Sequence, residues 1–328
     1  MITPNTFLHP NLFDKDVERL PTRNGYGLGL VEAGKNDERV VVLCADLAES
    51  TRSEYFQKEF PLRFVEVGVA EQNMASLASG MALAGKIPFI SSYAAFSPGR
   101  NNEQIRTTIA LNNVGVKIAG AHAGLSVGPD GATHQALEDI ALMRALPNMA
   151  VLVPCDLEEA KKATVAAAKH NGPVYIRLAR EATPVMTTDR TPFAIGRAQV
   201  FHEGSDVTII AAGPLVHEAL LAAQALLKRG VSAEVLNCAS VKPLAEHDII
   251  ESVKKTGAVV TVEEHQIAGG LGGAVAELLC RELPLPVEFV GVRDRFGESG
   301  TPEELLTAFR LTHPFIIEAA RKAIQRKR

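Results

Sequence analysis

The stretch AEQNMASLASGMALAGKIPFIS, residues 70–91, contains the repeating unit that decides the fold class. Its first part, Ala70–Ala84, is rich in small residues and predicts a helix, and its last part, Lys86–Ser91, is a short apolar run that predicts a buried strand. Similar runs stand on either side, RVVVLC at Arg39–Cys44 and VGVKIA at Val114–Ala119. Strands that alternate with helices indicate parallel crossover units, so we expect an α/β fold.

The same alternation extends over the rest of the chain, with one interruption. The other expected helices are at residues 102–111, 135–145, 215–229 and 244–255, and one more follows residue 153 and ends at Lys169. The other expected strands are at 149–153, 174–177, 207–212, 233–236 and 258–262. The interruption is EATPVMTTDRTP, Glu181–Pro192, whose prolines and threonines indicate a linker. We therefore expect two consecutive doubly wound domains with mainly parallel sheets.

Composition and charge exclude several classes of function. The 328 residues include 34 Lys and Arg against 38 Asp and Glu, a net charge of -4, which offers no basic face to nucleic acid or to a membrane surface. The charged run Asp14–Asp16 stands where a signal peptide needs apolar residues, and no uncharged stretch reaches the roughly 18 residues of a membrane span. The 4 cysteines lack any short metal or redox spacing. We expect a cytoplasmic protein with free thiols and with neither a nucleic-acid nor a membrane partner.

Glu71 is the first candidate for chemistry. It follows a β-like run in EVGVAEQNM, Glu66–Met74, where a helix is expected to begin. A glutamate there can simply compensate the helix dipole. Its neighbours are apolar, however, and a carboxyl group in apolar surroundings tends to have a raised pKa and can move a proton. The residues alone leave both interpretations open.

Two aromatic residues follow the strand expected at 86–91. They are Tyr93 and Phe96, in SSYAAFSPGR, Ser91–Arg100. Their rings can pack in the core, or they can form a platform for a flat heterocycle, because ligands of open α/β sheets bind at the carboxyl ends of strands.

The loop AHAGLSVGPDGATHQALED, residues 121–139, is the densest polar segment. His122, Asp130 and His134 stand among glycines, which let the backbone approach a ligand closely. Their spacings match no short metal-ligand pattern, so we expect no metal site within this chain. Each histidine can be an ordinary surface residue, but hydrogen bonds to a polyhydroxylated substrate suit the set better.

Arg23, Ser50 and Arg180 are far apart in the sequence, and exposure on the surface is the ordinary interpretation of such arginines. Together with a histidine they could bind a phosphate through charge-assisted contacts. The glycine run HQIAGGLGGAVAEL, His265–Leu278, resembles a dinucleotide fingerprint but has Val275 where a third glycine or alanine is expected. Close packing of a helix is the better interpretation of that run.

Five segments, in this order, are similar to sequence blocks of the C-terminal half of transketolase. They are GVAEQNM, SYAAF, AHAGLSVGPDGATHQALED, MRALPN and FGESGTPEELL. The resemblance implies a pyrimidine-binding domain with the thiamine diphosphate-binding fold at 17–187 and a transketolase C-terminal domain at 193–328. It also implies thiamine diphosphate-dependent transfer of a two-carbon ketol unit from a ketose phosphate to an aldose phosphate.

The resemblance implies roles for single residues at the matching positions. Glu71 would bond the aminopyrimidine ring of the cofactor and favour its imino tautomer, and Phe96 would stack on that ring. Tyr93 and Asp46 would contact the cofactor, and His122 would take part in the reaction. His122 and Asp130 would also bond substrate hydroxyls, and the substrate phosphate would be bound by Arg23, Ser50 and Arg180. His134 matches a position that contacts phosphate in some relatives and lies near the cofactor in others.

The sequence also departs from the family pattern. The segment SPGRNNEQ after Phe96 lacks a further aromatic residue that many transketolases have. The Gly-Asp-Gly motif that holds the metal and diphosphate of the cofactor does not occur in the sequence. The resemblance therefore implies that an N-terminal transketolase subunit supplies Mg²⁺ or another divalent cation and binds the diphosphate. We expect an α2β2 assembly of a split transketolase acting on phosphorylated sugars.

Three alternatives remain at this level. Half of a 1-deoxyxylulose-5-phosphate synthase, or the beta subunit of a 2-oxo-acid dehydrogenase, would share the glutamate and the architecture. Arg23 with Ser50, and the segment FGESGTPEELL, favour transketolase. A nucleotide-binding or scaffolding module would leave Glu71, Phe96 and Asp130 without a shared purpose.

Overall fold

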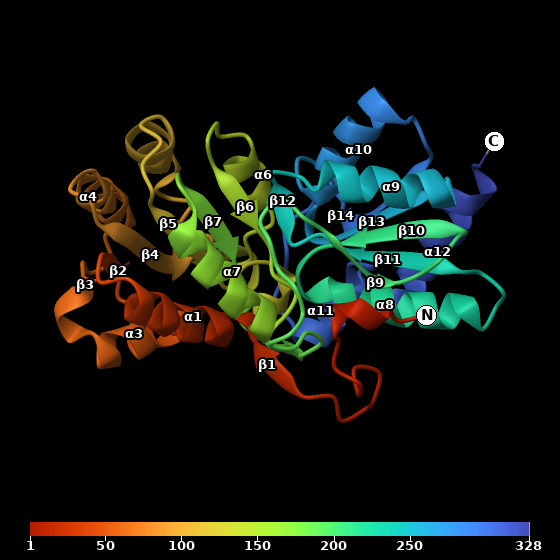
Figure 1. The fold of residues 1–328 in the computed structure, drawn as a ribbon, viewed down its shortest axis with the longest axis horizontal. Helices are drawn as coiled ribbons and strands as arrows, with labels where there is room; N and C mark the ends of the chain where they lie inside the picture. Colours follow the sequence, from red (N-terminus) through yellow and green to blue (C-terminus); the bar gives the residue numbers. More distant parts are fainter. Residues whose placement is uncertain (328) are drawn as a thin grey trace.

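The computed structural model describes residues 1–327, and two α/β units lie side by side in it (Figure 1). A sheet of 7 strands forms the first unit, in the order β12-β6-β7-β5-β4-β2-β3. Its strands are β2 (Val40–Cys44), β3 (Phe64–Glu66), β4 (Ile87–Tyr93), β5 (Lys117–Ala121), β6 (Ala150–Leu152), β7 (Val174–Arg177) and β12 (Ser240–Lys242). Neighbouring strands pair in parallel, except that β12 is antiparallel to β6. Strands such as β2 are buried along their whole length, as expected of a parallel sheet covered on both faces.

Helices cover this sheet. They are α1 (Thr22–Asn36), α2 (Ala48–Thr51), α3 (Glu54–Glu59), α4 (Glu71–Leu83), α5 (Asn102–Gln104) with the π-helical turn η3 (Ile105–Ala110), α6 (Asp139–Arg144) and α7 (Leu157–Lys169). Two glycines bring α1 very close to α7. A Cβ atom at Gly25 would lie 2.0 Å from the carbonyl oxygen of Leu157, and one at Gly29 would lie 2.6 Å from Cβ of Thr164. Any side chain at these positions would push the two helices apart.

The second unit is a sheet of 5 strands in the order β14-β13-β10-β11-β9. Its strands are β9 (Gln199–His202), β10 (Val207–Ala211), β11 (Ala233–Asn237), β13 (Val259–Gln266) and β14 (Val287–Val292). They pair in parallel except for the antiparallel pair of β9 and β11. The covering helices are α8 (Val216–Leu227), α9 (Glu246–Thr256), α10 (Leu271–Glu282), α11 (Pro302–Ala308) and α12 (His313–Gln325). Within residues 1–327, no helix has both the length and the apolar character to cross a bilayer.

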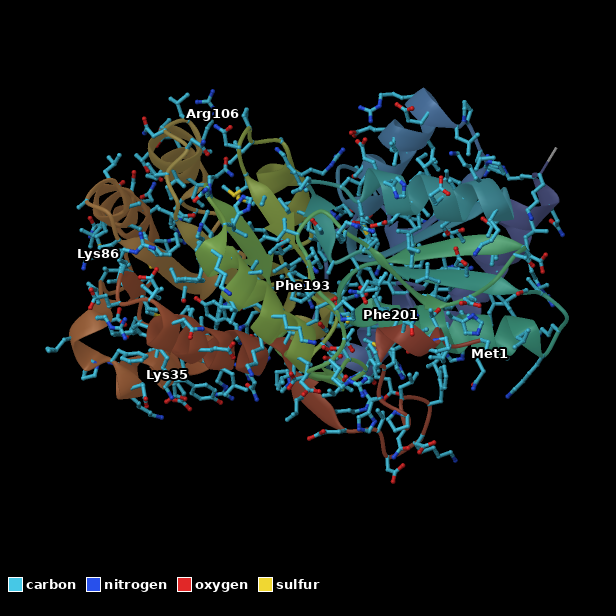
Figure 2. The ribbon with its side chains drawn as sticks, viewed as in Figure 1. Met1, Lys35, Lys86, Arg106, Phe193 and Phe201 are labelled. Atoms are coloured by element: carbon cyan, nitrogen blue, oxygen red, sulfur yellow. The ribbon has the colours of Figure 1, made fainter. Side chains whose placement is uncertain are left out.

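The two units are joined by segments that cross between them. Strand β12 comes from the second half of the sequence but extends the first sheet. The amino-terminal residues lie against the second unit, where the Thr3 N–H donates to the Phe201 carbonyl at 3.1 Å and Leu12 enters the core. Figures 1 and 2 show this segment, beginning at Met1, beside β9 and α8. The strand β1 (Arg19–Pro21) then leads into α1.

The structure confirms the α/β fold with mainly parallel sheets, and several local predictions differ from it. The strand expected at 86–91 continues to Tyr93, and the helix expected from 135 begins only at Asp139. The polar loop expected at 121–139 contains a run of 3-10 turns, η4 (Leu125–Thr133). The expected linker contains a strand, β8 (Ala182–Pro184), which pairs with β1. Its partner lies far away in the sequence, so no local pattern indicated it.

Candidate active site

The carboxyl ends of β2, β4 and β5 meet at one edge of the first sheet, where ligands of open α/β sheets bind. Tyr93 is the last residue of β4, and it pairs with Ala121, the last residue of β5. His122 follows Ala121, so register alone places the tyrosine beside the histidine. Their ring centroids lie 3.9 Å apart.

Four rings gather at this edge, and we call Tyr93, Phe96, His122 and His134 the aromatic group. Tyr93 and Phe96 are stacked, with centroids 5.9 Å apart and planes 25° apart. The His134 ring meets Phe96 edge-on at 5.5 Å, and its Nδ1 lies 2.9 Å from the Thr133 hydroxyl. Tyr93 and Phe96 are half-buried, so part of each ring is open to a ligand.

His122 is held as a neutral imidazole. Burial, followed by the positive charges of Arg23 and Arg180, lowers the pKa of His122 to about 3. The Nη1 of Arg23 lies 3.4 Å from His122 Nε2, and an arginine can only donate, so Nε2 accepts and Nδ1 carries the hydrogen. This Nδ1–H is buried and has no partner among the described residues. An unpaired buried donor costs free energy, so a ligand atom that accepts from it would stabilise the site.

Cationic side chains lie next to the aromatic group. Arg23 donates to the carbonyl of Ser50 at 2.7 Å, and Arg180 donates to the carbonyl of Val127 at 2.7 Å. Arg180 also lies 3.5 Å from the carboxylate of Asp130. Burial and the nearby charges of Arg52 and Arg180 lower the pKa of Arg23. Cations that repel one another in this way make a region that favours an anion.

Glu71 is the first residue of α4, and its side chain is only 3% exposed. Its Oε1 accepts a hydrogen bond of 3.3 Å from the hydroxyl of Ser92, the residue before Tyr93. Its carbonyl oxygen accepts from Asn101 Nδ2 at 3.1 Å. No Lys, Arg or His lies within ion-pairing distance of this carboxylate in the part of the chain that the structure describes. The carboxyl group is therefore fixed beside β4 without a neutralising cation.

The structure brings most of the sequence-predicted residues together. Contacts join the aromatic group, Arg23 and Ser50, and Ser92 connects Glu71 to the same strand end. Arg180, which pairs with Asp130, lies near enough for its charge to lower the pKa of His122. Asp46 is apart from them. It is an exposed residue beyond β2, and its N–H donates to Glu66 Oε1 at 2.8 Å. Among residues 1–327, no three His, Cys, Asp or Glu side chains are grouped closely enough to hold a metal ion.

Sequence reasoning missed several residues of the site. Ser92 and Asn101 lie in or next to the segment already singled out for its rings, but nothing in their pattern showed that they fix Glu71. Arg52 donates to Asn24 Oδ1 at 3.0 Å and adds charge near Arg23. No local signal could have found it, because its role depends on the packing of α1 against the turn after α2.

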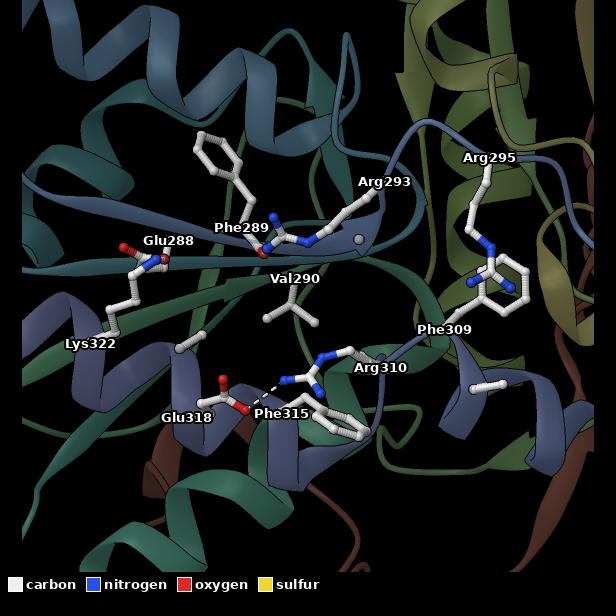
Figure 3. A pocket seen from close by; sticks show the side chains of 13 residues that line it. Glu288, Phe289, Val290, Arg293, Arg295, Phe309, Arg310, Phe315, Glu318 and Lys322 are labelled. Atoms are coloured by element: carbon white, nitrogen blue, oxygen red, sulfur yellow. Dashed lines mark hydrogen bonds and ion pairs between the residues drawn. The ribbon is translucent and has the colours of Figure 1, made fainter.

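A separate cavity of about 180 Å³ lies in the second unit, between β14, α11 and α12 (Figure 3). Arg295 stacks on Phe309 there at 3.6 Å, and Arg310 pairs with Glu318 at 2.7 Å. No residue of the candidate active site lines this cavity. We therefore assign the chemistry to the sheet edge of the first unit, where the buried carboxyl, the rings and the cations converge.

Comparison with known proteins identifies the family. Residues 18–186 match the family model of the transketolase pyrimidine binding domain, and residues 196–316 match that of the transketolase C-terminal domain. The chain belongs to the transketolase family. The family implies thiamine diphosphate as the cofactor.

The relatives show which part of a transketolase this chain represents. A putative transketolase C-terminal section from Methanocaldococcus jannaschii is 47% identical over 88% of this chain and 92% of that protein. A 6-deoxy-6-sulfo-D-fructose transketolase subunit from a Clostridium species is 41% identical over 96% of this chain and 98% of that protein. Human transketolase is 37% identical over 94% of this chain, which spans only 49% of that protein.

A solved structure of a split gene transketolase, described as an inactive beta4 tetramer, is 48% identical to this chain. It superposes with a TM-score of 0.89 over 94% of this chain and 100% of that one. The chain is therefore a transketolase subunit, the C-terminal section of a split enzyme, and the resemblance seen in the sequence is confirmed. A split enzyme of this kind implies an N-terminal partner subunit.

Proposed function

We propose that this transketolase subunit, together with an N-terminal partner, transfers a two-carbon ketol unit from a ketose phosphate to an aldose phosphate with thiamine diphosphate. The observation that carries the proposal is the meeting, at one sheet edge, of a buried carboxyl group, stacked rings and an arginine-rich loop region. The stacked pair Tyr93 and Phe96 offers a face to a flat ring. The Nδ1–H of His122 has no partner among residues 1–327 and so offers a hydrogen bond to a ligand. These features suit the pyrimidine end of the cofactor and a hydroxylated substrate.

Glu71 is assigned the proton chemistry. When bound, thiamine diphosphate supplies the nucleophilic carbon that breaks and forms the carbon–carbon bond. The carboxyl group of Glu71 would bond a ring nitrogen of the aminopyrimidine and hold a proton there. Within the described residues no cation lies within ion-pairing distance, so no salt bridge competes with the cofactor for this carboxyl group. Ser92 donates to the carboxyl group and Asn101 to the backbone carbonyl of Glu71, so together they keep this residue beside the strand end.

His122 and Asp130 are assigned to the substrate. A neutral imidazole at His122 donates from Nδ1 to a substrate oxygen and does not release a proton near neutral pH. The carboxylate of Asp130 accepts from a sugar hydroxyl. Asp130 is held next to Arg180 by their ion pair, so its orientation depends on the same arginine that faces the anion.

Arg23, Arg180 and Ser50 are assigned to the phosphate of the sugar. Guanidinium groups bond the oxygens of a phosphate in pairs, which gives orientation as well as affinity. His134 lies against Phe96 and is assigned to the boundary between cofactor and phosphate. Asp46 and Tyr93 remain proposed cofactor contacts. For Asp46 the support is its position at the carboxyl end of β2.

We further propose that the partner chain binds the diphosphate together with Mg²⁺ or another divalent cation, in an α2β2 assembly. The support is the absence of the Gly-Asp-Gly motif from the sequence. The two proposed domains, 17–187 and 193–328, would then form one subunit whose sheet edge faces the partner. The expected setting is the pentose phosphate interconversions of carbohydrate metabolism.

A second candidate donor comes from the relatives. One is named a 6-deoxy-6-sulfo-D-fructose transketolase subunit and another an apulose-4-phosphate transketolase subunit. A sulfonate is also a tetrahedral oxyanion, so Arg23 and Arg180 could hold it in the same way as a phosphate.

A reconstitution experiment tests the proposal. The chain is mixed with its N-terminal partner, thiamine diphosphate and Mg²⁺, and melting temperature and ketol transfer are measured with each component left out in turn. We expect stabilisation by the cofactor only when both chains are present. Parallel assays with phosphorylated, sulfonated and unsubstituted ketoses identify the donor. Cofactor binding to the complex without any ketol transfer would refute the proposed reaction.

A further inference from the structure

The loop that carries the proposed substrate contacts is held by the second unit. We call residues 122–134 the substrate loop. Glu264, on β13 of the second unit, accepts a hydrogen bond of 2.5 Å at Oε1 from the backbone N–H of Ser126. Gln135, just after the loop, donates to the carbonyl of Glu298 at 3.0 Å. Both contacts join residues more than 130 positions apart in the sequence.

Glu264 is itself fixed from several sides. Its side chain is 3% exposed, and its carbonyl accepts from Arg177 Nη2 at 2.9 Å. Arg177 is buried and bonds Asp139 Oδ2 at 2.9 Å, and the hydroxyl of Tyr175 donates to the same oxygen at 2.6 Å. Burial raises the pKa of Glu264, while the charge of Arg177 and the N–H of Ser126 oppose that rise. The backbone of Glu264 is thus fixed by buried residues, and its carboxyl group bonds the substrate loop.

The loop is shaped to receive this side chain. Gly124 has a φ of +92°, a conformation that favours glycine, and a Cβ atom there would lie 2.5 Å from Glu264 Oε1. Gly124 stands two residues after His122 and six before Asp130. A shift of the contact would therefore move both ends of the segment that is proposed to meet the substrate.

We propose that Glu264 is a positioning residue that sets the substrate loop, so that the C-terminal domain takes part in catalysis through this carboxyl group. The inference rests on the proposed function for the role of His122 and Asp130. The contact itself does not depend on that function. A cavity of about 600 Å³ between the two units is lined by both Ser126 and Glu264, so the contact lies beside open space and not within packed core. Loss of the bond would free the part of the loop around Ser126, while Gln135 would still bond Glu298.

Hydrogen–deuterium exchange on the full-length chain tests the contact without any assay of activity. Glu264→Ala should speed exchange of the 122–134 amides by about 10-fold or more and leave the strands of both sheets unchanged. Glu264→Gln retains an oxygen that accepts from Ser126, so its exchange should stay near that of the wild type. Arg144→Ala is the control, because Arg144 also joins the two units, at the carbonyl of Gly269, but does not touch the loop.

Kinetics of the complex with its partner test the consequence. Glu264→Ala should lower kcat/KM for the sugar about 10- to 100-fold, mainly through KM, because small misplacements of binding groups have effects of this size. The Kd of thiamine diphosphate should change less than the KM of the sugar, because His134 is the one residue of the loop that is assigned near the cofactor. Glu264→Gln should recover most of the loss. If Glu264→Ala does not fold, Gly124→Ala disturbs the same contact from the loop side and should reproduce the effects.

Unchanged loop exchange in both Glu264→Ala and Gly124→Ala would overturn the inference. Faster exchange with unchanged kcat/KM would also overturn it, because the loop would then be held for a reason unrelated to the substrate. A complete lack of ketol transfer in the wild-type complex would instead refute the proposed function, and the exchange data would still report on the contact.

Discussion

Replacement of Glu71 by glutamine tests the centre of the proposed mechanism. Glutamine has nearly the shape of glutamate, and its amide oxygen can accept the bond from the Ser92 hydroxyl that Glu71 Oε1 accepts at 3.3 Å. No salt bridge is lost, because the described residues provide no cation within ion-pairing distance of Glu71. The free energy of unfolding should therefore change by less than about 1 kcal/mol, which shifts Tm by no more than about 4 °C in a chain of this size.

The expected effect on turnover is much larger. An amide cannot hold a proton at the pyrimidine nitrogen, and general acid–base catalysis of this kind contributes about 10²- to 10⁴-fold to a rate. That corresponds to about 2.7–5.4 kcal/mol of transition-state free energy. The assay is ketol transfer by the complex reconstituted with its partner, measured beside Tm and beside the Kd of thiamine diphosphate.

Glu159→Gln is the matched control. Glu159 is also 3% exposed in the first unit, and it accepts from the Cys155 N–H at 2.7 Å and from Asn237 Nδ2 at 2.6 Å. Burial raises the pKa of Glu159 to about 7, but no contact joins it to the aromatic group. This control should retain full turnover. Near-normal turnover of Glu71→Gln in a folded complex would refute the assignment of the proton step, and an equal loss in Glu159→Gln would show that the effect is not local.

Three further predictions concern other ionisable groups. Arg180→Ala should raise KM for phosphorylated sugars by roughly 10- to 100-fold and lower kcat less, because one charge-assisted bond contributes about 1.5–3 kcal/mol. If the wild type has equal KM values for phosphorylated and free sugars, Arg180 does not bind the phosphate. The pKa of His122 is about 3, so His122 should not titrate between about pH 5 and pH 8. The profiles of kcat against pH for His122→Asn and the wild type should therefore be parallel in this range. A pH dependence that is present in the wild type and absent from the variant would show that His122 does titrate there. Burial lowers the pKa of Lys117 to about 7 in the folded chain, whereas the unfolded value is near 10.4, so the unfolded state binds more protons between these values. Stability of the wild type relative to Lys117→Met should rise across this range by up to about 1.4 kcal/mol per pH unit, and a constant difference in thermal or urea unfolding would argue against a neutral Lys117.

Much of this protein could be predicted from local patterns. The apolar runs at 39–44, 86–91 and 114–119 indicate buried strands, because they are short and rich in β-branched and apolar side chains. The strands lie at Val40–Cys44, Ile87–Tyr93 and Lys117–Ala121, so the third is shifted toward the C-terminus. Parallel strands bring their carboxyl ends to one edge, which is why Tyr93, His122 and the residues near β2 meet although they are far apart in the sequence. The motif blocks likewise indicated the family without a structure.

Other features depend on contacts that only the folded chain makes. The neutral state of His122 comes from its burial near Arg23 and Arg180, which are both far from it in the sequence. Two contacts join segments that are far apart in the sequence: Ser240–Lys242 pairs with the first sheet, and Glu264 bonds Ser126. The sequence pattern of neither segment predicts its partner. The physical reason is that local periodicity reports which face of an element avoids water, whereas electrostatics and loop position depend on which distant groups come to lie there.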